Sequence, residues 1–215
     1  MKFFLDTANL KDIQSCLKLG LVDGVTTNPS LIAKEGVDMK DRILEILDIV
    51  DGPVSVEVTT DDLQEMIKQG LEYHSWHANV YVKLPCTPTG VQALIELKKH
   101  GVKVNMTLVF SLSQALICAK LGADFVSPFI GRLDDIGVDG IEFVSNVKDA
   151  YALYGFETQV LAASIRSVDH VTSCIAVAAD ICTIPVKIYN QLLAHPLTDK
   201  GQAQFLADFK SSMNA

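Results

Sequence analysis

The feature that most constrains the fold of this chain is a regular alternation of short apolar segments with longer amphipathic ones. Eight segments have strand character, with β-branched or other apolar residues bounded by Gly, Pro or Asp; they span 2–5, 23–28, 53–58, 80–84, 102–107, 124–129, 159–164 and 180–185. Helical spacing of apolar residues fills the intervals, and two more helical patterns follow, at 186–193 and 199–213. Alternating strands and helices require a parallel sheet. Eight such units predict an α/β fold, a single-domain (β/α)8 TIM barrel with an extra C-terminal helix.

An open, doubly wound sheet is the alternative arrangement. That fold usually has a glycine-rich turn after its first strand, whereas this chain reads D-T-A-N at 6–9. No linker divides the chain, so we expect residues 1–215 to form one domain, with a loop in the Gly- and Asp-rich segment 131–140. The final helix places Phe205, Leu206 and Phe209 near one face, and we expect it to pack on the barrel or on a neighbouring subunit.

The composition excludes several classes of partner. With 49% hydrophobic and 20% charged residues, the chain can bury a large core. A formal net charge of −8 argues against nucleic acid or an anionic membrane as a partner, and no stretch resembles a signal peptide or a membrane span. Five cysteines without C-x-x-C pairing predict reduced thiols in a cytoplasmic protein, and the histidines show no metal-ligand spacing.

The segment N-V-Y-V-K-L-P-C at 79–86 contains an unusual lysine. Because side chains alternate along a strand, Lys83 shares one face with Tyr81, while the valines and the leucine around it take the other. A lysine held there would be partly desolvated, which disfavours the ammonium and gives a more nucleophilic amine. Such an amine suits Schiff-base formation with a carbonyl. A lysine that extends its ammonium into solvent is the alternative.

Polar side chains follow nearly every expected strand at its carboxyl end, where barrels of this type hold their active sites. The same alternation pairs Glu57 with Ser55 on one face, and Ser164 with Ala162. Each residue alone could be a helix cap or a buried hydrogen-bonding group, but their joint placement predicts one common site. The set comprises Asp6, Thr26, Asn28, Glu57, Lys83, Asn105, Thr107, Ser127, Ser164 and Arg166.

These residue types indicate chemistry on a sugar phosphate. Lys83 offers a nucleophile, and Glu57 and Asp6 offer two carboxylates for proton transfer. Neutral amides and hydroxyls suit a polyhydroxylated substrate. Arg132 and Arg166 could clamp a phosphate dianion, with surface salt bridges as the alternative. The combination favours class I aldol chemistry; the alternative is a sugar-phosphate isomerase in which the lysine acts as a charge or a base.

Several segments, in the family's order and across nearly the whole chain, resemble the transaldolase family: F-L-D-T-A at 4–8, G-V-T-T-N-P-S at 24–30, V-K-L-P at 82–85, N-M-T-L-V-F-S at 105–111, S-P-F-I-G-R at 127–132 and A-A-S-I-R at 162–166. The short length resembles the small transaldolase and fructose-6-phosphate aldolase-like branch. This resemblance implies transfer of a dihydroxyacetone unit in the non-oxidative pentose phosphate pathway. The implied donors are sedoheptulose 7-phosphate and fructose 6-phosphate, and the implied acceptors are glyceraldehyde 3-phosphate and erythrose 4-phosphate.

The resemblance also implies roles for single residues. Lys83 matches the Schiff-base lysine, and Asp6 matches the acid/base of carbon–carbon cleavage. Glu57 with Thr107 matches the pair that handles a water during dehydration and hydrolysis. Neither a metal nor an organic cofactor is implied, and the partner is a second copy of the chain, in a ring-shaped homo-oligomer such as a decamer of two pentamers. The expected substrate-binding residues are Thr26, Asn28, Asn105, Ser127, Phe129, Arg132, Ser164 and Arg166.

Two positions separate the two activities of this branch. Related fructose-6-phosphate aldolases carry Gln where Glu57 stands and Tyr where Phe129 stands, and a tyrosine hydroxyl there supports release of free dihydroxyacetone. Both residues here are of the transaldolase type, so we expect a transaldolase, with fructose-6-phosphate aldolase as the alternative. Ile165 replaces the aromatic residue of the family's S-F-K or S-F-R motif and should face the helices. A catalytically silent scaffold or sensor would be expected to have lost some of these polar residues, and none is lost.

Overall fold

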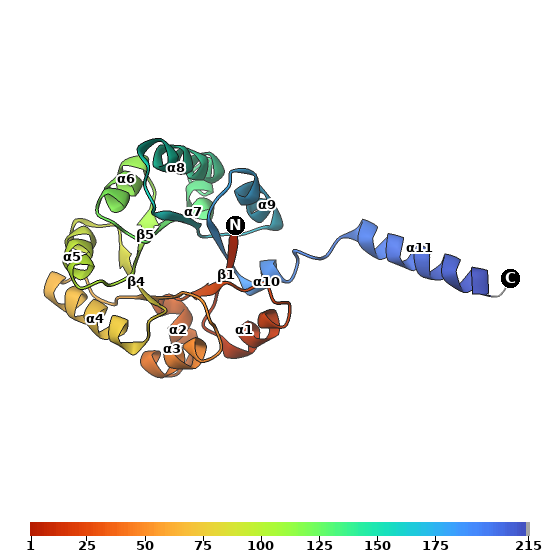
Figure 1. Ribbon diagram of the computed structural model, residues 1–215, viewed down its shortest axis with the longest axis horizontal. Coiled ribbons are helices and arrows are strands. Elements are labelled where there is room, and N and C mark those ends of the chain that lie inside the picture. The colour runs from red at the N-terminus through yellow and green to blue at the C-terminus, as the bar shows by residue number, and fades with distance from the viewer. Residues whose placement is uncertain (214–215) are drawn as a thin grey trace.

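The computed structural model describes residues 1–213, and eight parallel strands within them close into one barrel (Figure 1). Each strand pairs with the next along the chain, and the last pairs with the first. This architecture confirms the predicted (β/α)8 barrel; the predicted domain, 1–215, includes two residues outside those described. The strands are β1 (Lys2–Asp6), β2 (Gly24–Thr26), β3 (Val54–Glu57), β4 (Val80–Pro85), β5 (Val104–Val109), β6 (Phe125–Pro128), β7 (Gln159–Ala162) and β8 (Ile181–Ile184).

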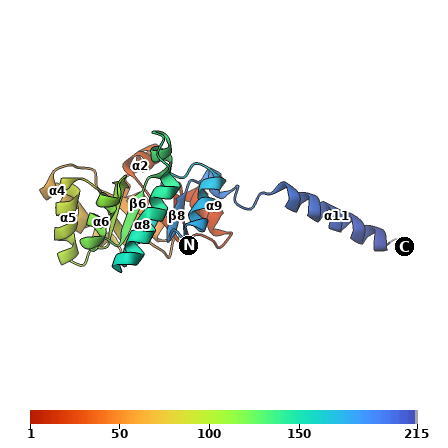
Figure 2. The ribbon, with the colours of Figure 1, turned by 90° about the horizontal axis from the view of Figure 1, so that it is seen from above.

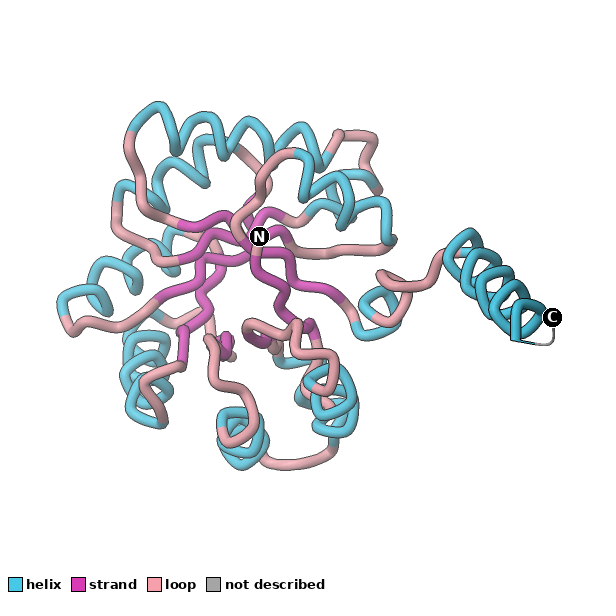
Figure 3. The backbone as a smooth tube through the Cα atoms, turned by 45° about the vertical axis from the view of Figure 1, so that its right-hand side comes forward, coloured by secondary structure: helices cyan, strands magenta, loops and turns pink. Residues whose placement is uncertain are grey.

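Helices cover the outside of the barrel, as Figure 3 shows with helices in cyan around strands in magenta. Strand side chains that face outward, such as Val82 and Leu84, are fully buried against this layer. Burial on both faces explains the nearly continuous apolar character of the strands. The helices are α1 (Leu10–Leu17), α2 (Pro29–Glu35), α3 (Met39–Leu47), α4 (Leu63–Trp76), α5 (Pro88–Lys99), α6 (Leu112–Lys120), α7 (Ile130–Asp134), α8 (Gly140–Tyr154), α9 (Val168–Ala176), α10 (Val186–Tyr189) and α11 (Pro196–Met213).

Side-chain caps set where the helices after β2 and β4 begin. The Asn28 Oδ1 atom accepts the Leu31 N–H at 2.9 Å, and the Thr87 Oγ1 atom accepts the Gly90 N–H at 3.0 Å. A proline follows each cap at the first helical position, where a missing N–H leaves no bond unmade. These caps fix the path of the chain as it leaves two strands whose ends border the site.

The lower interior of the barrel is an aromatic layer. Tyr81 and Phe125 stack with ring centroids 4.4 Å apart, and Phe4 meets Phe125 edge-on at 6.0 Å. Leu161 and Ile181 belong to the same small core. Such aromatic pairs add stabilisation beyond their buried area. This layer fills the barrel interior near the amino ends of the strands. Inward side chains that come later in the same strands therefore have open space only on the side of the carboxyl ends.

Three aspartates hold the amino ends of the strands. Each carboxylate accepts a backbone N–H of a neighbouring strand at 2.8 Å, and two of them also pair with a lysine of a covering helix. Hydrogen bonds to an ionised acceptor are stronger than neutral ones, so they help to fix the start of the strands. The pairs are Asp23 with Phe3, Asp124 with Val104, and Asp180 with Val160.

The expected loop at 131–140 is partly helical, because α7 occupies its first half. Ile130 and Leu133 are buried, and α7 packs against α8. The two apolar residues are one helical turn apart, so a helix buries both, which a loop would not do as well. The Gly- and Asp-rich composition alone concealed this pattern.

The structure also moves several expected boundaries. β5 continues to Val109 instead of ending at Thr107, with Leu108 in the left-handed region (φ 59°) where the register with β6 shifts. β7 ends at Ala162, two residues earlier than expected. The ends of β5 and β7 both lie beside the candidate site.

α11 extends away from the barrel at the end of the connection 190–195 (Figures 1 and 2). No residue of Pro196–Met213 is buried. The helix therefore does not pack on its own barrel in this structure, which was one of the two packings expected for it. Packing on a neighbouring subunit stays a prediction. Within residues 1–213, no helix is both long enough and apolar enough to cross a membrane.

Candidate active site

A cavity opens at the carboxyl end of the barrel, above the aromatic layer. The predicted site residues line it, except Glu57 and Arg166, which lie at its margin. Side chains from all around the barrel therefore meet in one place, as the strand-end pattern predicted. The lining residues are Asp6, Thr26, Asn28, Lys83, Asn105, Thr107, Ser127, Phe129, Arg132, Leu161, Ala163, Ser164 and Thr183.

Lys83 points into the barrel and does not extend into solvent, since it is only 6% exposed. Its Nζ atom lies 2.9 Å from Glu57 Oε2 and donates to the Thr27 carbonyl oxygen at 3.1 Å. The register of the sheet produces the ion pair, because Glu57 on β3 stands directly beside Lys83 on β4. An amine held between a carboxylate and a carbonyl has a proton acceptor in contact, which it needs before it can act as a nucleophile.

Asp6 is the second carboxylate of the site. Burial raises the pKa of the Asp6 carboxyl above its usual value, while the charge of Lys83 and a hydrogen bond from Thr26 oppose that rise. The Thr26 Oγ1 atom donates to Asp6 Oδ1 at 2.8 Å and lies 2.7 Å from Thr183 Oγ1. Because the single Thr26 hydroxyl proton goes to Asp6, Thr183 is the donor in the second bond.

Thr183 was missed by the sequence reasoning, although β8 carries the necessary signal. In I-C-T-I, strand alternation puts Thr183 on the same face as Ile181, which belongs to the interior aromatic layer. The same parity argument that was applied to the other strands would have placed the threonine in the cavity.

A second hydrogen-bonded group crosses the opposite side of the cavity. Asn105 Nδ2 donates to Ser55 Oγ at 3.1 Å, and Ser127 Oγ donates to Asn105 Oδ1 at 2.7 Å. All three residues are buried, so these bonds satisfy polar groups that water does not reach. The Asn105 amide is held in one orientation, since both its donor and its acceptor end are bonded. Ser55 was expected on the inward face but was not one of the predicted site residues.

Thr107 lines the same cavity, but its hydroxyl forms no bond with this network. Its Oγ1 atom is buried and has no hydrogen-bond partner among residues 1–213. Buried polar groups are nearly always bonded, so an unpartnered hydroxyl lining a cavity marks a position for a water or a substrate oxygen.

Phe129 lies where β6 leads into α7. The Arg132 guanidinium lies 4.9 Å from the centroid of the Phe129 ring, and Phe110 packs edge-on at 5.8 Å. A cation over an aromatic face is held electrostatically, so Phe129 fixes the Arg132 side chain at the cavity wall.

Ser164 reaches the cavity by a different route from the expected one. At the end of β7, Leu161 and Ala163 face the barrel interior, whereas Ala162 faces the helices. The prediction that Ala162 and Ser164 share one face is therefore wrong. The strand has already ended, and Ser164 adopts a left-handed backbone (φ 59°) that redirects its side chain. Ile165 is buried in the outer core, as expected.

Arg166 is held outside the cavity by Asp135. The two side chains form a bidentate ion pair in which one N–O distance is 2.6 Å, and both are about half exposed. Gly131 lies beside them, and a Cβ atom there would be 2.5 Å from the Ser164 carbonyl oxygen and from the Arg166 Nε atom. The close approach of α7 to this loop therefore requires glycine.

Among residues 1–213, no cluster of three or more His, Cys, Asp or Glu side chains is placed to hold a metal ion. The cavity and its margin instead bring together an amine, two carboxylates, several hydroxyls and a guanidinium. This set can bind a polyhydroxylated anion, add to its carbonyl and transfer protons.

Comparisons with known proteins place the chain in a family. The family model described as transaldolase/fructose-6-phosphate aldolase matches residues 3–215. The chain is 52% identical over 214 residues to a probable transaldolase of Parabacteroides distasonis, with 98% of each chain covered. It is also 52% identical over 214 residues to a probable transaldolase of Methanococcus maripaludis, with both chains covered in full.

A solved structure of thiamine phosphate pyrophosphorylase from Pyrococcus furiosus superimposes with a TM-score of 0.59 at 15% identity, covering 89% of this chain and 93% of that one. At this identity the likeness concerns the fold alone. The match of the family model over nearly the whole chain and the identity to full-length relatives lead to one conclusion. The chain belongs to the transaldolase/fructose-6-phosphate aldolase family.

Proposed function

We propose that the protein is a transaldolase, which moves a dihydroxyacetone unit from a ketose phosphate to an aldose phosphate through a Schiff base on Lys83. The observation that carries this proposal is the buried Lys83 amine, 2.9 Å from a carboxylate and lining a cavity. The donors would be sedoheptulose 7-phosphate or fructose 6-phosphate. The acceptors would be glyceraldehyde 3-phosphate or erythrose 4-phosphate, as in the pentose phosphate pathway.

In the first step the Lys83 amine, after giving a proton to Glu57, adds to the donor's C2 carbonyl. The resulting carbinolamine loses its hydroxyl as water, with Glu57 returning a proton. The unpartnered Thr107 hydroxyl can hold this water, because it lines the same cavity as Lys83. The same pair would guide a water back to the Schiff base at the end of the cycle, which frees the amine.

In the second step Asp6 takes the proton of the donor's C4 hydroxyl. The C3–C4 bond then breaks, an aldose phosphate leaves, and the electron pair is held as an enamine conjugated to the Lys83 nitrogen. The acceptor aldehyde is attacked by this enamine, and Asp6 returns its proton to the new alkoxide. The raised pKa of Asp6, caused by burial, suits a carboxyl that must both take and give a proton.

The remaining polar residues would bind and orient the sugar phosphate. Asn28, Asn105 and Ser127 offer neutral donors and acceptors to hydroxyls, with Asn105 and Ser127 bonded to each other. Arg132 and Ser164 line the wall on which a phosphate would sit. Arg166 would join them by exchanging its exposed ion pair with Asp135 for an ion pair with the substrate phosphate.

Phe129 favours the transferase over the aldolase that releases free dihydroxyacetone. Release requires a proton for the enamine carbon, and a phenylalanine has none to give. The Phe129 ring also carries Arg132 on one face and Phe110 at its edge, which limits the space for a water there. The enamine would then persist until an acceptor aldehyde arrives.

Borohydride reduction in the presence of fructose 6-phosphate tests the Schiff base. We expect a stable adduct on Lys83, identified by peptide mass spectrometry, and loss of both adduct and activity in Lys83→Arg. Lys98→Arg is a matched control, since Lys98 pairs with Asp124 at the amino end of the barrel. Full activity in Lys83→Arg would refute the mechanism.

A product assay separates the two activities. Fructose 6-phosphate is incubated with and without erythrose 4-phosphate, and sedoheptulose 7-phosphate and free dihydroxyacetone are measured together. A transaldolase produces sedoheptulose 7-phosphate only with the acceptor and little free dihydroxyacetone. Free dihydroxyacetone formed without an acceptor would move the enzyme to the aldolase class while leaving the Lys83 chemistry intact.

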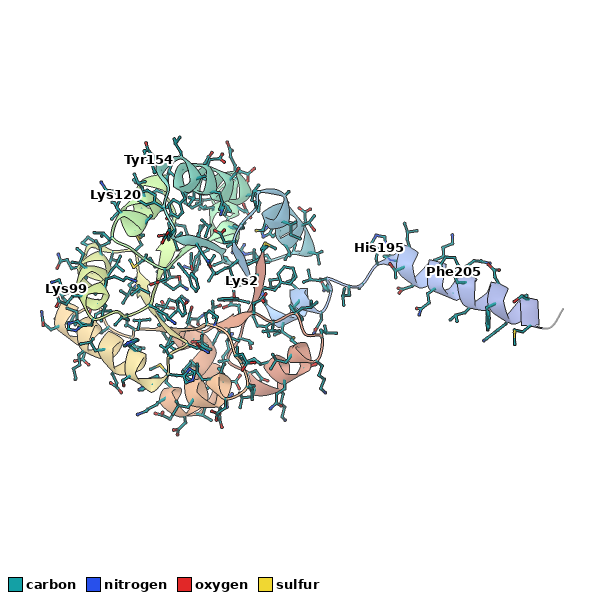
Figure 4. All side chains as sticks on the ribbon, viewed as in Figure 1. Lys2, Lys99, Lys120, Tyr154, His195 and Phe205 are labelled. Atoms are coloured by element: carbon teal, nitrogen blue, oxygen red, sulfur yellow. The ribbon has the colours of Figure 1, made fainter. Side chains whose placement is uncertain are left out.

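We also propose that the protein is a cytoplasmic homo-oligomer in which α11 packs on a neighbouring subunit, with a decamer of two pentamers as the expected form. The apolar side chains of α11 support this, since Phe205 is 75% and Phe209 63% exposed in the single chain. Figure 4 shows Phe205 on this helix, away from the barrel. Analytical ultracentrifugation of the full chain and of a chain ending at Ala194 tests it. If the two proteins form particles with the same number of subunits, α11 has no part in the assembly.

A further inference from the structure

Two thiols outside the cavity lie in contact beside the end of β4. Cys86 follows β4 directly and Cys118 lies on α6, and their sulfur atoms are 3.6 Å apart. Cys86 is half-buried, whereas Cys118 is fully buried. A disulfide needs a sulfur–sulfur distance of about 2.05 Å, so the two atoms are about 1.5 Å from bonding distance.

The surroundings make these two thiols unequal. The hydrogen-bonding contact with the Cys118 thiol lowers the pKa of the Cys86 thiol, although burial acts in the opposite direction. The same contact and burial raise the pKa of Cys118. Because the thiolate is the nucleophile, Cys86 is the sulfur that reacts first, and it is also the one that solvent reaches.

We propose that Cys86 and Cys118 form an oxidation site at which a hydroperoxide produces an intramolecular disulfide. The Cys86 thiolate attacks one peroxide oxygen, the O–O bond breaks, and Cys86 becomes a sulfenic acid. The other oxygen takes a proton and leaves as water or an alcohol. The Cys118 sulfur then attacks the Cys86 sulfur, and the displaced hydroxide leaves as water with the Cys118 proton. The two thiols lose two electrons, which the hydroperoxide gains.

The remaining cysteines provide an internal comparison. Cys16, Cys174 and Cys182 are all buried. The neighbouring Cys174 thiol and burial raise the pKa of the Cys182 thiol. A peroxide would have to enter the core to reach either of them. The site therefore depends on contact between two thiols combined with solvent access to one.

The disulfide would disturb one wall of the cavity. The Cys86 N–H donates to the Thr107 carbonyl oxygen at 2.8 Å. Gln114 donates to the Cys86 carbonyl oxygen at 3.4 Å and accepts the Phe110 N–H at 2.9 Å, and Phe110 packs on Phe129. Drawing the sulfur atoms together shifts these contacts, so we expect a several-fold loss of activity that dithiothreitol reverses. This consequence, unlike the disulfide itself, rests on the proposed function.

Mass mapping of the oxidised full-length protein tests the site. The protein is treated with a small excess of hydrogen peroxide, unfolded, alkylated with iodoacetamide and digested. We expect one cross-linked peptide pair that joins Cys86 to Cys118, with the other three cysteines alkylated. A Cys86 that stays reduced, a sulfinic acid at Cys86 beside a reduced Cys118, or a disulfide between two copies would each overturn the proposal.

Two variants test the order of reaction. In Cys118→Ala we expect a sulfenic acid at Cys86 that a cyclic 1,3-dione traps, and several-fold slower alkylation of Cys86 in the folded protein at neutral pH. Cys174→Ala is the matched control, a buried cysteine on another helix whose loss should leave the disulfide unchanged. Unchanged alkylation and no trapped sulfenic acid in Cys118→Ala would refute the role of Cys118. Cys86→Ser, at a half-buried position, should retain its activity after peroxide treatment.

Discussion

Replacing Thr183 by valine tests whether the threonine pair positions Asp6, the proposed acid/base. Thr183 donates to Thr26, which in turn donates to Asp6, and both threonines are buried. Valine has nearly the shape of threonine and lacks the hydroxyl, so the change removes one donor and leaves the barrel lining filled. Thr26 would lose the bond that holds its hydroxyl toward Asp6, and hydroxyls in a chain strengthen one another's bonds.

The expected effect follows from the value of one hydrogen bond. A typical intramolecular bond contributes about 1 kcal/mol, which corresponds to a factor of about five in an equilibrium constant. The lost stabilisation applies to the carboxylate form of Asp6, since that form accepts the bond. Burial already raises the pKa of Asp6, with Glu57 acting in the same direction and Lys83 against it. The Thr183→Val change should therefore raise the pKa of Asp6 further. At acid pH, where Asp6 is partly protonated, the activity should fall about fivefold.

The assay is kcat/KM against pH for fructose 6-phosphate with erythrose 4-phosphate. In Thr183→Val the acid limb should move to higher pH, while the rate at the alkaline end, where Asp6 is ionised in both proteins, should change little. Thr183→Ser retains the donor and should restore the original profile. A Val profile that superimposes on the original, or an equal loss at every pH, would refute a positioning role.

Further predictions concern the carboxylate, the cavity wall and the phosphate clamp. Asp6→Asn should lose about 10²–10⁴-fold in activity. Because burial raises the pKa of Asp6, its contribution to stability is full below the unfolded pKa and is lost as pH rises through the folded pKa; urea unfolding should therefore find the Asn variant more stable at neutral pH, with the difference closing in acid. Phe129→Tyr should increase free dihydroxyacetone in the product assay, and an unchanged yield would remove Phe129 from the choice of product. Arg166→Gln should raise KM for fructose 6-phosphate about tenfold, the value of about 1.4 kcal/mol of lost phosphate binding, without changing the thermal midpoint, because its ion pair with Asp135 is exposed.

Strand alternation was enough to predict most of the side chains that line the cavity. In β4 and β6 the period of two correctly turns Lys83 and Ser127 inward, and parallel pairing brings Glu57 beside Lys83 without any information on side-chain contacts. The barrel itself follows from eight strand–helix units, because parallel strands need crossovers and the crossovers must cover the sheet.

The period fails where a strand ends early or changes register. Ser164 lies beyond the end of β7, and its left-handed backbone points it into the cavity despite its parity. Leu108 lies at the register shift of β5, so counting from Thr107 onward would assign the wrong faces. The Arg166–Asp135 pair joins two loops and has no periodicity at all, which is why the sequence could not place Arg166 at the margin of the cavity.

Four of the strands supply a residue of the interior aromatic layer and, two positions later, a polar residue of the cavity, and this spacing explains how the barrel tolerates buried polar groups there. The lower residue joins the aromatic layer, and the upper one must find a polar partner, because an unbonded buried polar group is costly. Lys83 forms an ion pair with Glu57, whereas the Thr107 hydroxyl has no hydrogen-bond partner among residues 1–213. The Thr107 hydroxyl is therefore available to the proposed water, while its neighbours Asn105 and Ser127 are bonded to each other. The strand pairs of lower and upper residues are Phe4 and Asp6, Tyr81 and Lys83, Phe125 and Ser127, and Ile181 and Thr183.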